Sequence, residues 1–305
     1  MSSQLAFVQI DVFTNTRYVG NPLAIVSVPS TSPSLTQHQK QAIAREFNLS
    51  ETVFLHDPIQ GADSNDPLIF PIDIFTTTEE LPFAGHPTVG TGWYLLGRYT
   101  DKETIMLRTK AGDIPVIRDS NGVRLQVPID FKVHDPYTHS FVKASSVQPN
   151  LTAADYVNGI DGPEVVASIV KGMTFMLLEL ASEDALARVM LYAERVKIPN
   201  EHLGEWKGFS SLYLFVVMED GVTVRTRLLD GGLEDPATGS AASTLCGYLS
   251  KKKGPGEWKF QVVQGVEMGR KSEIGVYVSV GDDGEVQKVE LAGSAVGVMN
   301  GFLEV

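Results

Sequence analysis

Two similar stretches lie 154 residues apart, and they constrain the fold more than any other feature of the chain. Each combines prolines and glycines in a short turn and then continues into an apolar run, residues 80–96 first and residues 235–249 second. Recurrence at a single offset of about half the chain predicts a duplicated unit. Two unrelated turns are the alternative, because proline and glycine are common in turns. The aligned pairs are Pro82 with Pro236, Gly85 with Gly239, His86 with Ser240, Tyr94 with Tyr248 and Leu95 with Leu249.

Each stretch predicts a loop that opens into a buried helix. The first turn of a helix exposes backbone N–H groups and carries partial positive charge, so it can hold a carboxylate or a developing oxyanion. His86 falls at the first of these helix starts and Ser240 at the second. A duplication therefore predicts two similar halves, each contributing one helix N-terminus, with one site between them.

Composition narrows the class of protein. A chain of 305 residues with 43% hydrophobic and 20% charged residues is long enough for one large or two medium domains with a real core. A net charge of −12 argues against nucleic acid as a partner, because phosphate binding needs a basic face. The single cysteine, Cys246, excludes an intrachain disulfide and any mechanism with two thiols in one chain. With no signal peptide and no apolar run of about 18 residues, we expect a cytoplasmic protein without a membrane partner.

Local signals divide the chain into two lobes. We expect residues 1–128 to form an N-terminal lobe and residues 129–298 a C-terminal lobe, with about 299–305 returning to the first. A capping box at Thr36 and Gln39 predicts a helix that runs to about Phe47. A strand over residues 52–55 then leaves Glu51 at a helix-to-strand junction. In the second lobe we expect helix over residues 164–169.

The chain lacks the sequence motifs of several common kinds of active site. The chain has no Gly-x-x-x-x-Gly-Lys phosphate loop, no Gly-x-Gly-x-x-Gly, no Gly-x-Ser-x-Gly elbow, no His-Glu-x-x-His and no paired cysteines. We therefore expect no cofactor and no metal. What remains is acid–base chemistry at two helix starts, with His86, Asp235, Ser240 and nearby Glu51 as its polar groups. Each has a structural alternative: Glu51 as a cap or ion-pair partner, His86 as a hydrogen-bonded core residue, the others as N-caps.

Three segments together resemble the signature segments of the phenazine-biosynthesis isomerase (PhzF-like) family. They are residues 47–54 (FNLSETVF), 81–90 (LPFAGHPTVG) and 235–240 (DPATGS). The similarity extends in pattern from Phe7 to the C-terminus. It implies the α+β fold of diaminopimelate epimerase: two pseudo-symmetric lobes, each a β-barrel-like sheet wrapped around a central helix, with the active-site cleft between them.

The resemblance also implies an activity. The family's named member isomerises trans-2,3-dihydro-3-hydroxyanthranilate without cofactor or metal, and its acid–base glutamate corresponds to Glu51. His86, Asp235 and Ser240 correspond to the other catalytic residues. The related epimerases carry a cysteine at each helix start, where this chain has His86 and Ser240, so a two-thiol epimerase is excluded.

The expected substrate is a small anionic metabolite. Its carboxylate would dock on N–H groups around Gly239 and Ser240, or around Gly85 and His86. Burial beside an apolar strand is expected to raise the pKa of Glu51 toward neutrality. Family members are often dimers, so a homodimer stays open, as does a binding protein that keeps the cleft without catalysis. The substrate-binding set also includes Thr238 and Ala241.

Overall fold

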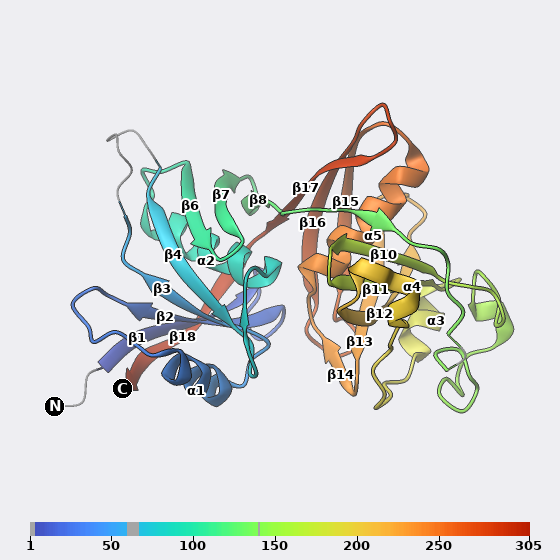
Figure 1. Ribbon diagram of the computed structural model, residues 1–305, viewed down its shortest axis with the longest axis horizontal. Coiled ribbons are helices and arrows are strands. Elements are labelled where there is room, and N and C mark those ends of the chain that lie inside the picture. The colour runs from blue at the N-terminus through green and yellow to red at the C-terminus, as the bar shows by residue number, and fades with distance from the viewer. Residues whose placement is uncertain (1–3, 60–66, 140) are drawn as a thin grey trace. The chain divides into compact units, whose positions relative to one another are not determined.

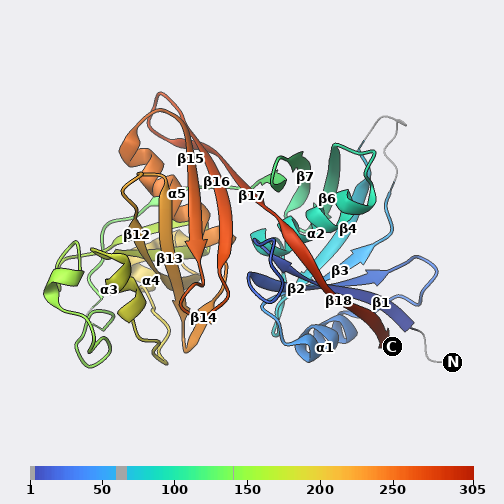
Figure 2. The ribbon, with the colours of Figure 1, turned by 180° about the vertical axis from the view of Figure 1, so that it is seen from behind.

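A computed structural model describes residues 4–59, 67–139 and 141–305 of the chain. The packing divides it into two compact units, which are drawn in Figures 1 and 2. Unit 1 comprises Met1–Val127 and Leu291–Val305, and unit 2 comprises Pro128–Glu290. Strand β17 (Val286–Gly293) crosses this boundary in the sequence.

Unit 1 is a curved sheet of mixed strands. Antiparallel and parallel pairs alternate: β1 with β2, β2 with β3 in parallel, β3 with β4, β4 with β6 in parallel, then β6 with β7. The C-terminal strand β18 adds to β1 in antiparallel register. The strands are β1 Gln4–Val12, β2 Asn21–Val28, β3 Thr52–His56, β4 Ile69–Phe75, β5 Glu80–Leu81, β6 Thr104–Thr109, β7 Gly112–Asp119, β8 Gly122–Gln126 and β18 Ala295–Glu304.

Helix α2 (Gly85–Arg98) is the centre of unit 1. It packs against β1, β2, β3, β6, β7, β8 and β18, and both ribbon views show it enclosed by these strands. Its first eight residues are all buried. Gly90 permits this close packing, because a Cβ there would lie 2.7 Å from side-chain carbons of Val12 and Leu23.

Helix α1 (Gln37–Phe47) covers the outer face of the same sheet. The predicted capping box is confirmed, since the Thr36 hydroxyl accepts from the Gln39 N–H at 3.2 Å. A separate apolar cluster under α1 includes Phe54 and Phe75, whose rings meet edge to face at 5.4 Å. Strand β3 is therefore covered on both faces, and Glu51 immediately precedes it.

Unit 2 repeats the architecture. Its strand pairs follow the same alternation: β10 with β11, β11 with β12 in parallel, β12 with β13, β13 with β15 in parallel, then β15 with β16. Helix α5 (Gly239–Lys253) packs on β10, β11, β15 and β16. The strands are β9 Lys132–Val133, β10 Val165–Val170, β11 Met173–Glu179, β12 Phe209–Val217, β13 Thr223–Asp230, β14 Leu233–Asp235, β15 Gly256–Gln264 and β16 Ser272–Val280.

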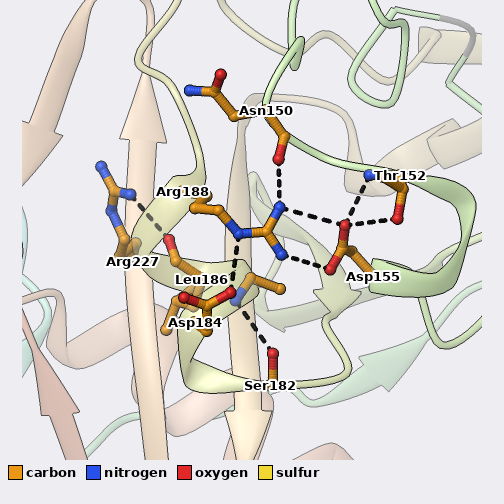
Figure 3. Close-up of polar contacts among 9 residues, drawn as sticks. Asn150, Thr152, Asp155, Ser182, Asp184, Leu186, Arg188 and Arg227 are labelled. Carbon is orange, nitrogen blue, oxygen red and sulfur yellow. Dashed lines mark hydrogen bonds and ion pairs between the residues drawn. The ribbon is translucent and has the colours of Figure 1, made fainter.

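Short helices cover the outer face of unit 2, where a cluster with Met176, Leu186 and Trp206 is buried. They are α3 Glu183–Arg188, α4 Asn200–Leu203, and the 3₁₀ turns η1 Ala153–Asp155 and η2 Gly204–Trp206. Figure 3 shows how Arg188 joins α3 to η1. Its guanidinium lies 2.6 Å from Asp155 and 2.9 Å from Asp184. The hydrogen bonds from Arg188 and from the Thr152 backbone lower the pKa of Asp155 to about 2.

The predicted fold class and the duplication are confirmed, because both units run through the same order of strand pairs around a central helix. Two expectations differ from the structure. Residues 164–169 were expected to be helical, but the run of β-branched residues there lies in strand β10. The segment that joins unit 1 begins at Leu291 rather than near 299. It includes the end of β17 and the whole of β18, which pairs with β1 from Ala295 onward.

Candidate functional site

Glu51 and His86 meet in unit 1, although they are 35 residues apart in the sequence. Glu51 lies just before β3, and His86 is the second residue of α2. The Nδ1 atom of His86 lies 2.9 Å from Glu51 Oε2, with 4% of the His86 side chain and 19% of the Glu51 side chain exposed. A carboxylate at this distance accepts the Nδ1–H, which fixes the orientation of the imidazole ring. The two residues therefore act as a pair.

The pKa of Glu51 is lowered, which corrects the expectation that it would be raised. Burial opposes ionisation of Glu51, but hydrogen bonding and charge from His86, together with a hydrogen bond from Ser50, outweigh it. The Ser50 hydroxyl oxygen also lies 3.2 Å from Oδ1 of the buried Asn21. Glu51 is thus held as an ionised carboxylate at neutral pH, which is the form that can accept a proton.

The other ring nitrogen of His86 is buried without a hydrogen-bond partner among the described residues. An unpaired buried polar atom costs about 1–3 kcal/mol, so such an atom in a folded protein calls for an explanation. At a site with a carboxylate on the opposite side of the ring, a bound ligand would supply the partner.

Neither central helix is capped by the side chain of its N-cap residue. Ala84 precedes α2 and has no polar side chain, and Thr238 precedes α5 without making a side-chain cap hydrogen bond within the described structure. The N–H groups of both first turns therefore keep capacity for an anion. Gly85 and His86 belong to the first turn of α2, and Gly239, Ser240 and Ala241 to that of α5.

Asp235 and Thr238 meet in unit 2. Asp235 ends the short strand β14, and its Oδ2 accepts from Thr238 Oγ1 at 2.5 Å. Ser240 is partly buried as the second residue of α5, and Gly239 and Ala241 are buried beside it. The structure thus brings Glu51 to His86 in one unit and Asp235 to Thr238 in the other.

Gln264 also belongs to this polar group, and sequence reasoning missed it. It ends strand β15 with a fully buried side chain. Its Nε2 donates to the Asp235 carbonyl at 2.8 Å and to Thr238 Oγ1 at 3.0 Å. The sequence itself showed only a glutamine after two valines at the end of a strand-like run, and the burial of its side chain became visible only in the structure.

Strand β14 is anchored by a buried ion pair. Arg227 of β13 contacts both carboxylate oxygens of Glu234 at 2.8 Å, and Glu234 directly precedes Asp235. The Arg227 guanidinium also donates to the backbone carbonyls of Leu186 and Val189, and Figure 3 shows the bond to Leu186. Bidentate geometry of this kind fixes direction as well as distance. Arg227 therefore holds the backbone that leads into Asp235.

Cys246 lies within α5 and is fully buried. Burial raises the pKa of its thiol well above the ordinary value, so the thiolate needed for nucleophilic chemistry is disfavoured. In the described part of the chain, no three or more His, Cys, Asp or Glu residues gather as they would around a metal ion. No helix in that part is both long and apolar enough to cross a membrane.

The fold of both units is that of the PhzF and proline racemase-like structures. A PhzF-family protein from Bacillus anthracis aligns over 99% of this chain and 100% of its own, with a TM-score of 0.75 and 24% identity. A hydroxyproline epimerase from Agrobacterium vitis aligns over 99% of this chain and 93% of its own, with a TM-score of 0.59 and 12% identity. At these identities the likeness concerns the fold alone.

The chain belongs to the phenazine biosynthesis-like protein family, whose model matches residues 10–301. An uncharacterized isomerase from Pasteurella multocida is 30% identical over all of this chain and 96% of its own length. Trans-2,3-dihydro-3-hydroxyanthranilate isomerase from Pseudomonas aeruginosa is 29% identical over 97% of this chain and 98% of its own. The resemblance inferred from three short segments is thereby confirmed.

Proposed function

We propose that this protein is an isomerase that moves a proton between carbon atoms of a small carboxylate-bearing metabolite. The observation that carries the proposal is the contact between Glu51 and His86 at the start of a buried helix. A carboxylate that is held ionised, and whose partner is an imidazole with one unpaired buried nitrogen, is equipped for proton transfer.

The proposed reaction begins when the Glu51 carboxylate removes a proton from a substrate carbon. The electron pair left behind spreads over the conjugated system of the substrate. Glu51, now protonated, returns a proton to a different carbon, so that no atom is gained or lost. His86 stabilises the carboxylate before the transfer, because its Nδ1–H donates to Oε2 of Glu51 at 2.9 Å.

Because its pKa is lowered, Glu51 is a weaker base than the raised pKa expected from the sequence would make it. The site must therefore lower the barrier to proton removal by stabilising the developing negative charge on the substrate. The first-turn N–H groups of α2 are suited to this, because Gly85 and His86 are buried and no N-cap side chain competes for them within the described structure. The substrate is therefore an anion whose carboxylate or enolate oxygen lies near this helix start.

The names of these relatives favour an enzyme over a binding protein. Two of them are isomerases by name, and one acts on trans-2,3-dihydro-3-hydroxyanthranilate. Asp235 and Ser240 are assigned catalytic roles, and Gly239 and Ala241 substrate binding, on the resemblance alone. Substitution of each of these residues in turn would test the role assigned to it.

Turnover of defined carboxylates tests the proposal. We expect the purified protein, with no cofactor or metal added, to isomerise trans-2,3-dihydro-3-hydroxyanthranilate or another conjugated carboxylate from a panel. Proton NMR would follow loss of substrate and growth of its isomer. Saturable binding of these compounds without conversion of any of them would instead support a binding protein.

A further inference from the structure

A hydrogen-bond relay behind the start of α5 consists of Tyr213, Gln264, Thr238 and Asp235. We propose that Gln264 is a positioning residue that acts through Thr238 to hold Asp235 as a hydrogen-bond acceptor for the substrate. This inference rests on the proposed function, in which Asp235 is a catalytic residue. It concerns only contacts within unit 2.

The side-chain amide of Gln264 makes every hydrogen bond that an amide can make. Its Oε1 accepts from the Tyr213 hydroxyl at 2.9 Å and from the Thr238 N–H at 3.3 Å. Its Nε2 donates to the Asp235 carbonyl and to Thr238 Oγ1. Two lone pairs and two N–H groups are thus all used.

Only one orientation of this amide satisfies its neighbours. A rotated amide would place its NH₂ group against the Thr238 N–H, so that two donors would face each other. It would also place its oxygen against the Asp235 carbonyl, so that two acceptors would face each other. Because the group is fully buried, water cannot relieve either conflict. The Thr238 N–H and the Asp235 carbonyl therefore fix which end of the Gln264 amide donates and which end accepts.

The orientation of the Gln264 amide determines which atoms donate and which accept at Thr238, and through Thr238 at Asp235. Thr238 Oγ1 accepts from Gln264, so its own hydrogen is free to donate, and Asp235 Oδ2 lies 2.5 Å away. Asp235 Oδ2 must then be an acceptor, which an ionised carboxylate oxygen provides. Thr238, named from the sequence as a substrate-binding residue, acts in this proposal on Asp235. This also explains why the Thr238 side chain does not cap α5.

Two variants test the relay, because Gln264→Met and Gln264→Glu are expected to change kcat with different dependence on pH. Methionine keeps the volume but removes all four hydrogen bonds, so we expect kcat to fall at least tenfold at every pH. Glutamate cannot donate when ionised, but as a protonated acid it restores one donor and one acceptor. The kcat of Gln264→Glu should therefore recover as the pH is lowered, and a residue with only a structural role would give no such recovery.

Thr226→Val is the matched control. The Thr226 hydroxyl lies 3.0 Å from the Tyr213 hydroxyl and is equally buried. Because Tyr213 gives its one hydrogen to Gln264, Thr226 is the donor in this contact, and Thr226→Val removes it without removing any of the four hydrogen bonds of Gln264. We expect this variant to keep kcat within about twofold, whereas Tyr213→Phe, which removes a bond to Gln264, should lower it by about three- to tenfold.

The measurements are kcat and KM with trans-2,3-dihydro-3-hydroxyanthranilate from pH 5 to 9, and hydrogen–deuterium exchange at the Thr238 amide. The relay predicts faster Thr238 exchange in Gln264→Met and unchanged exchange in Thr226→Val. Unchanged Thr238 exchange in folded Gln264→Met would overturn the relay without any assay of activity. Wild-type kcat in Gln264→Met while Asp235→Asn is inactive would also overturn it. If Glu51→Gln stays fully active, the proposed function fails separately.

Discussion

Replacement of Glu51 by glutamine is expected to lower kcat/KM by about 100- to 10,000-fold, the range that general acid–base catalysis supplies. Glutamine keeps the shape of the side chain and can still meet His86 Nδ1, but it cannot accept a proton from carbon. Glu51 is only partly exposed and lies next to β3. The amide has nearly the same size as the carboxylate and is neutral, so the fold should tolerate it at this position. The measurement is steady-state turnover together with the thermal unfolding midpoint.

Glu51→Asp is the control for position. It keeps the carboxylate but withdraws it by one methylene, so its activity should lie between those of the wild type and Glu51→Gln. A folded Glu51→Gln protein with wild-type turnover would show that another group removes the proton.

Replacement of His86 by leucine is expected to lower kcat/KM by about 100-fold and to move the acidic limb of the pH–rate profile to higher pH. Burial opposes ionisation of Glu51, and His86 provides most of the compensation. Without the imidazole, the pKa of Glu51 rises, so at a given acidic pH less of the base is ionised. In the wild type the limb should lie below pH 4.5, the ordinary pKa of glutamate, because the pKa of Glu51 is lowered.

His86→Asn separates the hydrogen bond from the charge. Its amide nitrogen can take the place of Nδ1 and donate to Glu51, but it carries no charge, so the limb should move less than in His86→Leu. Profiles extended to about pH 3 at the acidic end, with identical limbs in all three proteins, would contradict the role given to His86.

The lowered pKa of Glu51 also makes the stability of the fold depend on pH. A carboxylate whose pKa is lowered in the folded state stabilises the fold above its ordinary pKa of 4.5. That contribution is lost as the pH falls through the lowered value. The contribution should be absent in Glu51→Gln.

The sequence predicted the parts of the fold that leave local signals. Gly85 and Gly239 marked both helix starts because a turn rich in glycine and proline preceded an apolar run. The capping box at Thr36 marked α1 in the same way. The prediction of a helix over residues 164–169 was wrong, because the β-branched residues of this segment favour a strand.

The site was only partly predictable, since its residues come from different elements. Glu51 and His86 were each identified, but their contact depends on how α2 packs beside β3. The apolar strand that suggested a raised pKa was visible in the sequence, and the hydrogen bond from His86 that reverses the direction was not. Gln264 was missed because it lies 26 positions after Thr238, and nothing in the sequence between them indicates that the two touch.

Uptake of solvent deuterium at carbon tests most directly whether Glu51 moves the proton. The wild-type protein and Glu51→Gln would be incubated in D₂O with trans-2,3-dihydro-3-hydroxyanthranilate and the panel of conjugated carboxylates. Both turnover and carbon-bound label would be followed by NMR. We expect turnover with carbon-bound deuterium in the wild-type product, and loss of both in Glu51→Gln. Equal turnover and equal label in the two proteins would contradict the role of Glu51 as the base.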